Sequence, residues 1–232
     1  MKKNIIISCV KSISSSSRKK RANIFRQLFS INCNSKILDL GSEEGTNINR
    51  VLEGTEVDNN NVYIADINPA WVNEGHRKFG YQPVHLQENE ILPFDNGFFD
   101  IVFCSSVIEH VTVTKDKIWK LYSGKVFKKE SLHRQKEFAQ EISRVGKQYY
   151  VQTPYKYFPI ESHTWMPLLG FFPRSLLINT LRFTNLFWIK KTSPDWNLLN
   201  KKQIQYLFPD AQIIKEKFCG MTKSIMAVRK MS

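Results

Sequence analysis

The first half of the sequence contains a glycine turn and an aspartate at a spacing suited to binding a ribose. The turn Asp39-Leu40-Gly41-Ser42-Glu43-Glu44-Gly45 follows an apolar run. Glycine permits positive φ, and it removes a side chain that would block a ligand lying against the backbone. About twenty residues later Asp66 ends a second apolar run, where a carboxylate can accept hydrogen bonds from both ribose hydroxyls. The spacing therefore predicts a site for a cofactor that contains a ribose.

Each of these features also has a purely structural interpretation. A turn between a strand and a helix can require one glycine, and Asp66, which precedes Asn68-Pro69, could cap a helix. The acidic residues Glu43 and Glu44 narrow the choice of cofactor. They would repel a pyrophosphate but not the cationic sulfonium and ammonium groups of S-adenosylmethionine (SAM). The turn thus favours SAM over a dinucleotide.

Four stretches extend this pattern in a consistent order, at residues 37–45, 63–67, 88–94 and 98–110. The third contains Glu88 followed by Ile91-Leu92-Pro93-Phe94, and the fourth ends in Ile108-Glu109-His110. Together they resemble the class I SAM-dependent methyltransferases, and more narrowly the methyltransferase-domain group with a Leu-Pro-Phe segment. With a late hairpin, the resemblance covers most of residues 35–230. It implies SAM as the cofactor and methyl transfer as the activity.

The resemblance assigns one set of residues to the cofactor: Asp39, Gly41, Gly45, Asp66, Ile67, Glu88, Asn89 and Ser105. It implies that the residues of the glycine turn lie around the methionine end of SAM. Asp66 would hold the ribose, Ile67 would pack on adenine, and Glu88 would receive the adenine amino group. The family commonly has three alternating glycines in the turn, and here Glu43 occupies the middle position.

Residues that could activate a methyl acceptor follow the predicted fifth strand, in the stretch from Thr153 to His163. This stretch is similar to a Thr-Pro, Phe-Pro-Ile-Glu, His pattern in a subset of these methyltransferases, often near envelope-sugar or natural-product pathways. His163 could act as a general base because its unperturbed pKa is near neutrality, and Glu161 could orient it. His110, at the end of the fourth strand, is expected to face the same cavity. All three could instead be structural.

Apolar runs and helical repeats alternate along the chain, which predicts a parallel sheet. Helical spacing occurs at 46–52 and through Phe138, Ile142 and Val145, ending at Gly146. Strands are predicted at 36–40, 61–66, 83–86, 99–104 and 148–152, with a final hairpin at 211–218 and 223–228. The expected fold is α/β, Rossmann-like and doubly wound, with a mostly parallel sheet, a late antiparallel strand hairpin and an inserted cap.

The expected domain organisation has two parts. Residues 1–34 form a basic leader, flexible over its serine run, with an N-terminal helix. Residues 35–232 form the methyltransferase domain. Within the domain, the lysine-rich segment 112–135 reads as an exposed helical insertion, and segment 153–199, rich in proline and tryptophan, as a substrate cap. The basic amphipathic stretch Arg174 to Lys191 could pack on the domain or lie on a membrane surface and meet a lipid-linked acceptor.

The charge distribution and the cysteines indicate which partners and which cellular compartment to expect. The 232 residues carry a net charge of +13, yet residues 36–110 hold 4 Lys/Arg against 13 Asp/Glu, so the positive excess lies outside the cofactor segment. The 4 cysteines form no CxxC pair, which argues against a zinc site and fits a reducing cytoplasm. We expect no metal, and the sequence does not indicate the oligomeric state.

The leading hypothesis is methyl transfer to a small-molecule acceptor, such as the hydroxyl of a sugar or of a lipid-linked glycan. The positive charge prompts a second hypothesis, an RNA methyltransferase. The sequence lacks a recognisable RNA-binding module, so nucleic acid is not the expected partner. Glu43 in the glycine turn prompts a third hypothesis, a SAM-fold protein that binds without catalysis.

Overall fold

The computed structural model describes residues 2–41, 43–87 and 91–231, with side chains from residue 14 onward. Seven strands form one sheet in the order β3-β2-β1-β4-β5-β7-β6. The pairs β1–β2, β1–β4 and β2–β3 are parallel, and β6–β7 is antiparallel. This is the predicted mostly parallel sheet with a late hairpin. The chain divides into two compact units: unit 1 comprises Met1–Phe103, Val145–Tyr150 and Lys230–Ser232, and unit 2 comprises Cys104–Arg144 and Val151–Arg229.

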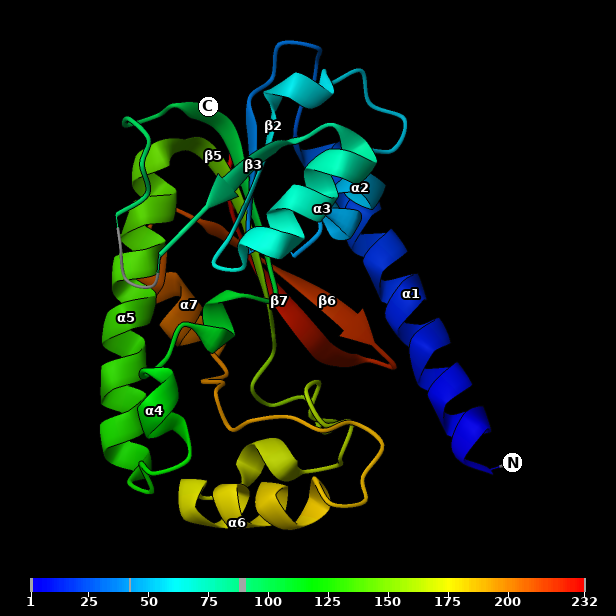
Figure 1. The fold of residues 1–232 in the computed structure, drawn as a ribbon, viewed down its shortest axis with the longest axis vertical. Helices are drawn as coiled ribbons and strands as arrows, with labels where there is room; N and C mark the ends of the chain where they lie inside the picture. Colours follow the sequence, from blue (N-terminus) through cyan, green and yellow to red (C-terminus); the bar gives the residue numbers. More distant parts are fainter. Residues whose placement is uncertain (1, 42, 88–90, 232) are drawn as a thin grey trace. The chain divides into compact units, whose positions relative to one another are not determined.

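Unit 1 contains the first strands of the sheet and three helices (Figure 1). The strands are β1 (Ile37–Leu40), β2 (Val62–Asp66), β3 (Gln82–His85) and most of β4 (Phe99–Ser105). The helices are α1 (Lys2–Leu28), α2 (Thr46–Leu52) and α3 (Pro69–Phe79), with a 3-10 turn η1 (Asn59–Asn61). Every residue of β1 is buried, as expected for a strand covered on both faces.

Local signals explain where α3 begins and ends. The side chain of Asn68 accepts a hydrogen bond from the backbone N–H of Ala70, and Pro69 occupies the first turn. The helix ends at Gly80, whose φ of 74° is the left-handed conformation that glycine adopts without a steric penalty. The cap of α3 is therefore Asn68 and not Asp66, which leaves the aspartate available for another role.

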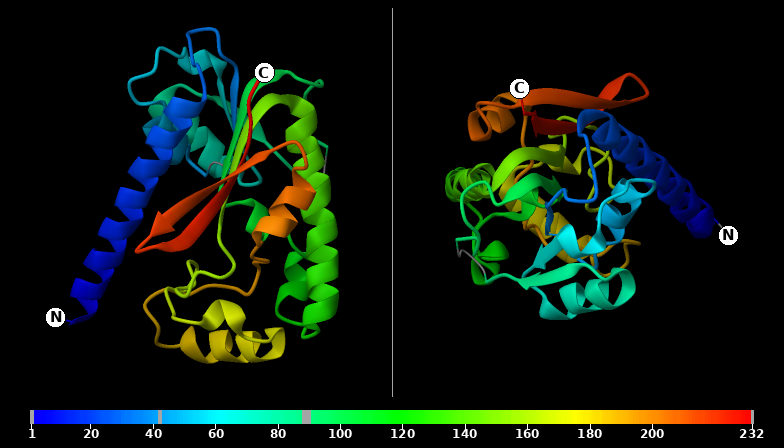
Figure 2. Two further views of the ribbon diagram at one scale, coloured as in Figure 1. Left: turned by 180° about the vertical axis from the view of Figure 1, so that it is seen from behind. Right: turned by 90° about the horizontal axis from the view of Figure 1, so that it is seen from above.

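Unit 2 contains the remaining helices and the hairpin. Its helical elements are η2 (Ile108–His110), α4 (Lys115–Ile118), nearly all of α5 (Gly124–Val145), η3 (Leu169–Phe171), α6 (Arg174–Thr184) and α7 (Lys201–Leu207). Strand β5 (Gly146–Pro154) belongs partly to each unit, and β6 (Gln212–Phe218) and β7 (Met221–Arg229) form the hairpin seen in Figure 2. Both turn residues, Cys219 and Gly220, have positive φ, which suits a tight hairpin.

Two segments of the expected domain organisation have a different local structure from the one expected. The serine run does not form a flexible leader, because it lies within α1, and Ser17 is buried there together with Ala22 and Phe25. Serine disfavours a helix by only a few tenths of a kcal/mol per residue, which packing readily overcomes. Segment 112–135 is not an exposed insertion either. Its second half is the beginning of α5, where Phe127 and Gln135 are buried on one helix face.

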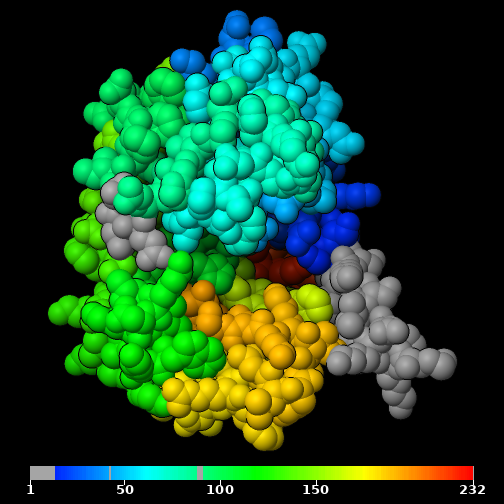
Figure 3. All heavy atoms as spheres, in the orientation of Figure 1, coloured from blue at the N-terminus to red at the C-terminus, as the bar shows by residue number. Residues whose placement is uncertain are grey.

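The middle of unit 2 has little regular structure apart from η3 and α6. Helix α6 buries Leu177, Ile178 and Leu181. Arg182 of α6 donates hydrogen bonds to the Trp119 carbonyl and the Tyr122 hydroxyl, so α6 lies beside the segment that follows α4. The two segments are neighbours on the surface in Figure 3, in yellow and green. Among the described residues no helix is long and apolar enough to cross a bilayer.

Candidate cofactor and acceptor sites

The turn after β1 has the backbone of a glycine-rich loop. Gly41 and Gly45 have φ values of 75° and 73°, and Glu43 between them has a φ of 52°. A Cβ atom on Gly45 would lie 3.2 Å from Ile64 Cγ2 and 3.4 Å from Tyr81 Cδ2, so a side chain there would be tight as well as strained by the positive φ. Glu43 adopts the left-handed backbone that glycine prefers, with its side chain exposed. The turn thus keeps its shape without the third glycine.

Asp66 joins this turn to the start of α3. Its Oδ2 accepts a hydrogen bond from the Glu43 backbone N–H at 3.1 Å, and its Oδ1 accepts one from the Asn68 N–H at 3.0 Å. The carboxylate is nearly buried at the carboxyl end of β2. Each carboxylate oxygen can accept more than one hydrogen bond, so Asp66 retains capacity for ligand hydroxyls. Asp66 therefore both orders the loop and offers a charged acceptor.

Asp39 is a buried carboxylate with incomplete pairing. It is 3% exposed at the third position of β1, and among the described residues its Oδ2 has no hydrogen-bond partner. Burial, with the nearby charges of Asp66 and Glu43, raises the pKa of Asp39 well above its ordinary value. A buried, unpaired carboxylate is unfavourable, and a cationic ligand group would offset that cost. The ammonium and sulfonium of SAM fit this acidic site.

We predict that Asp39→Asn stabilises the ligand-free protein while weakening its response to SAM. The raised pKa means that the folded state binds a proton more tightly than the unfolded state. The free energy of unfolding of the wild-type protein therefore falls as pH rises from the pKa of Asp39 in the unfolded state toward its pKa in the folded state. The variant should melt at a higher temperature than wild type at pH 7, and the difference should shrink near pH 4. Thermal unfolding with and without SAM measures both effects. A variant that melts lower at pH 7 yet keeps the full SAM-induced shift would contradict this assignment.

The remaining cofactor candidates have different surroundings. Ile67, immediately after β2, is 45% exposed. Ser105, in unit 2, donates a hydrogen bond of 2.7 Å to Gln152 Oε1. The Gln152 carbonyl accepts the backbone N–H of Ser106, whose φ is 62°. Gln152, which sequence reasoning did not assign to the site, thus holds the turn after β4. Glu88 and Asn89 lie outside the described residues.

A second constellation lies entirely within unit 2, and we call it the histidine cluster: Glu109, His110, Glu161, His163 and Asp195. The rings of His110 and His163 meet edge to face, with centroids 4.7 Å apart. His163 Nδ1 lies 2.5 Å from Glu161 Oε1, and His110 Nδ1 lies 3.3 Å from Asp195 Oδ2. The structure therefore brings together the three residues predicted to act on the acceptor. It adds Asp195 and Glu109, which sequence reasoning did not identify.

Electrostatics in the histidine cluster favour the ionised form of two carboxylates and the protonated form of His110. Burial opposes charge on His110, but the hydrogen bond that its ring donates to Asp195 and the charge of Glu109 outweigh it, so the pKa of His110 lies above its ordinary value. Burial would likewise raise the carboxyl pKa values of Glu161 and Asp195. Their histidine partners reverse this effect, and both pKa values lie below the ordinary range. Each of the two histidines therefore faces an ionised carboxylate.

Separate segments of unit 2 hold the histidine cluster in place. Buried Gln135 of α5 donates hydrogen bonds to the carbonyls of Ile108 and Asn197. Asn197 in turn donates its backbone N–H to the Glu109 carbonyl at 2.8 Å. The Trp196 ring stacks on His163 with centroids 4.8 Å apart. Fixed side chains of this kind are what acid–base or ligand chemistry requires.

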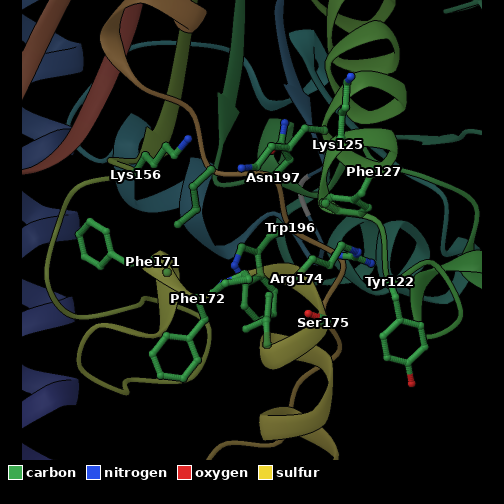
Figure 4. Close-up of a pocket in the computed structure, with 16 residues that line it drawn as sticks. Tyr122, Lys125, Phe127, Lys156, Phe171, Phe172, Arg174, Ser175, Trp196 and Asn197 are labelled. Carbon is green, nitrogen blue, oxygen red and sulfur yellow. The ribbon is translucent and has the colours of Figure 1, made fainter.

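A pocket of about 640 Å³ in unit 2 is lined by the start of α5, the start of α6 and residues 196–198 (Figure 4). Its lining combines aromatic rings with basic side chains: Tyr122, Phe127, Phe171, Phe172 and Trp196, with Lys125, Lys128, Lys156 and Arg174. Arg174 is structural, because its guanidinium donates to the carbonyls of Leu121, Pro194 and Ile118. Burial lowers the pKa of Arg174 to about 10. The three lysines of the lining, Lys125, Lys128 and Lys156, remain available to attract an anionic ligand.

Comparison with known proteins identifies a methyltransferase domain in the chain. Residues 38–148 match the family model described as a methyltransferase domain. No curated protein sequence matches the chain.

Solved structures share the fold at low sequence identity. One, a chain from the complex between a methyltransferase activator and the putative methyltransferase of Haloferax volcanii, has a TM-score of 0.54 and 12% identity over 94% of this chain and 90% of its own. A putative O-methyltransferase from Nostoc punctiforme has a TM-score of 0.57 and 10% identity over 92% of this chain and 56% of its own. A carbon methyltransferase named CurJ has a TM-score of 0.50 and 14% identity over 86% of this chain and 49% of its own. The chain therefore spans only about half the length of the last two proteins.

Proposed function

Because this chain is a class I SAM-dependent methyltransferase, we propose that it methylates a hydroxyl group of a small-molecule acceptor, of the sugar or lipid-linked glycan class. The observation that supports a hydroxyl acceptor is the pairing of two histidines with two carboxylates in the histidine cluster. A hydroxyl must lose its proton during transfer, and paired imidazoles are suited to assist that loss.

Unit 1 supplies the cofactor residues in this proposal. SAM, when bound, supplies a methyl carbon on a positive sulfur that leaves as a neutral thioether. Asp39 neutralises the cationic methionine end, Asp66 accepts the ribose hydroxyls, and Ile67 covers adenine. Within unit 2, Ser105 and Gln152 order the backbone that follows β4. The chain contributes alignment and desolvation, because SAM already carries the activated carbon.

Unit 2 supplies the acceptor residues. The pocket of about 640 Å³ falls in the range of small-molecule sites, which are mostly apolar with a few polar groups. Its aromatic walls suit the apolar faces of a sugar ring, and Lys125, Lys128 and Lys156 suit a phosphate such as that of a lipid-linked glycan. Trp196 belongs both to this lining and to the stack on His163, which connects the pocket with the histidine cluster.

The decisive experiment incubates the protein with methyl-labelled SAM and a fractionated cell extract. We expect label in the glycan or lipid fraction, stable to mild base as an ether is. Label in RNA would instead establish the nucleic-acid alternative. SAM binding without labelling of any fraction would favour a non-catalytic binding protein.

A membrane-associated acceptor gives a further prediction, which rests on the outer face of α6 and the residues after it. Leu176, Phe183, Leu186 and Phe187 are 48%, 65%, 78% and 57% exposed, and basic Lys191 follows them. We predict that the protein co-sediments with anionic lipid vesicles. Phe183→Ser combined with Phe187→Ser should weaken that binding at least about tenfold, since burying each phenylalanine contributes roughly 1.5–3 kcal/mol. Tyr206→Ser, which removes an exposed aromatic ring from α7, is the matched control. Equal losses in both proteins, or no vesicle binding by wild type, would contradict the membrane proposal.

A further inference from the structure

The histidine cluster contains three potential ligand groups that face one another. Glu109, His110 and His163 each offer a donor atom, and the three donor atoms lie within 4.8 Å of one another. They come from η2 and from the irregular segment that precedes η3, both in unit 2. Two imidazoles and one carboxylate are a common ligand set for divalent transition metals, with open positions left for substrate.

The carboxylate partners determine which imidazole nitrogen is available. Glu161 and Asp195 occupy the Nδ1 atoms of His163 and His110, at 2.5 and 3.3 Å. Each Nε2 therefore remains for a ligand. Histidines that bind metals usually donate their other ring N–H to a carboxylate or carbonyl, which fixes the tautomer and raises the basicity of the ligating nitrogen. Here both histidines have such a partner.

Glu109 provides an independent observation that points to a cation site. Its side chain is completely buried, and its Oε2 accepts a hydrogen bond from the Thr153 hydroxyl at 2.9 Å. Its Oε1 is also buried, yet it has no hydrogen-bond partner among the described residues. Leaving a buried carboxylate oxygen unpaired is costly unless a cation binds there. Among the described residues, the histidine cluster thus combines an unpaired carboxylate oxygen with two imidazoles whose Nδ1 atoms already face carboxylates.

We propose that Glu109, His110 and His163 bind one divalent transition-metal ion, with Glu161, Asp195 and Thr153 orienting the ligands. Ligands at about 2.0–2.2 Å from a tetrahedral metal lie roughly 3.3–3.5 Å apart, so the three side chains must close slightly around the ion. His110 has a side chain that is 36% exposed, which leaves a route for the ion and for an acceptor atom. The spacing of the cysteines does not bear on this site, since none of its ligands is a thiolate.

The catalytic role of this metal site rests on the proposed function, methyl transfer to a hydroxyl group. A bound cation lowers the pKa of a hydroxyl that coordinates it, so the acceptor can lose its proton to solvent before the oxygen attacks the methyl carbon. The new O–C bond then forms as the C–S bond of SAM breaks, and the electron pair stays on sulfur. In this arrangement His163 is a ligand and not itself the proton acceptor.

Cobalt binding tests the site without SAM or acceptor. The full chain is treated with a chelator, dialysed and titrated with Co²⁺ while visible absorption and melting temperature are followed. We expect one Co²⁺ per chain, with at least tenfold weaker binding by Glu109→Gln and by His110→Ala. Asp195→Asn, which removes an orienting partner, should weaken binding about 10–100-fold. His110→Ala keeps the test valid if Glu109→Gln does not fold, because His110 is the partly exposed ligand.

His133→Ala is the matched control, since His133 forms an exposed pair with Glu137 on α5. It should leave Co²⁺ affinity unchanged. Equal weakening by His133→Ala, or unchanged affinity in folded Glu109→Gln and His110→Ala, would overturn the metal site. The two proposals can be refuted independently. Methyl transfer without Co²⁺ binding would refute the metal site alone. Co²⁺ binding without methyl transfer to any fraction would refute the proposed function alone.

Discussion

Replacement of His163 by alanine is expected to lower the turnover of methyl transfer by about 10² to 10⁴, while SAM affinity remains nearly unchanged. The imidazole lies against Glu161 and Trp196, within the histidine cluster, and is 12% exposed. Its loss should therefore affect acceptor activation and not the cofactor loop of unit 1. Steady-state kinetics with labelled SAM and calorimetry with SAM measure the two quantities separately. For an amine or carbon acceptor that needs no deprotonation, the change should instead appear mainly in the acceptor KM.

His133→Ala serves again as the control for removing an imidazole from unit 2, and it should retain full turnover. Glu161→Gln tests the partner, because it preserves the side-chain size while removing the charge that faces His163 Nδ1. We expect an intermediate loss for this variant. If turnover and acceptor KM both survive His163→Ala in a folded protein, His163 is structural and His110 becomes the residue to test.

The second large effect is expected from Asp66→Ala, which should weaken SAM binding by roughly 1.5–3 kcal/mol for each charged hydrogen bond lost. The carboxylate also accepts the backbone N–H groups of Glu43 and Asn68, so the variant should lose some thermal stability as well. Calorimetry at a temperature below the melting temperature of the variant measures SAM affinity in the folded protein. The loss of affinity is thereby separated from the loss of thermal stability.

Asp58→Ala is the matched control for Asp66→Ala. Asp58 likewise accepts a hydrogen bond from the backbone N–H two residues later, that of Asn60, but it lies before η1 and away from the glycine turn. It should cost stability and leave SAM affinity intact. Unchanged SAM affinity in Asp66→Ala would show that the cofactor binds elsewhere.

Several features of the two units were predictable because their signals are local. Strands buried on both faces appear as short apolar runs, so β1, β2 and β4 were recognisable from residue types alone. The glycine turn and Asp66 stood out by spacing, since a strand, turn and helix in succession place such residues at one end of the strands. Lone residues such as His163 and Glu161 could be identified as candidates only because they are close in sequence.

Tertiary structure decided the features that depend on distant residues. Asp195 lies 85 positions from its partner His110, so no local pattern could connect them. Glu109 and Thr153 are 44 positions apart and meet only because unit 2 brings η2 to the end of β5. The unpaired oxygen of Glu109 and the contact between the rings of His110 and His163 are likewise products of packing. Helix α1 extends through the serine run, where Ser17 is buried, and serine disfavours a helix only weakly.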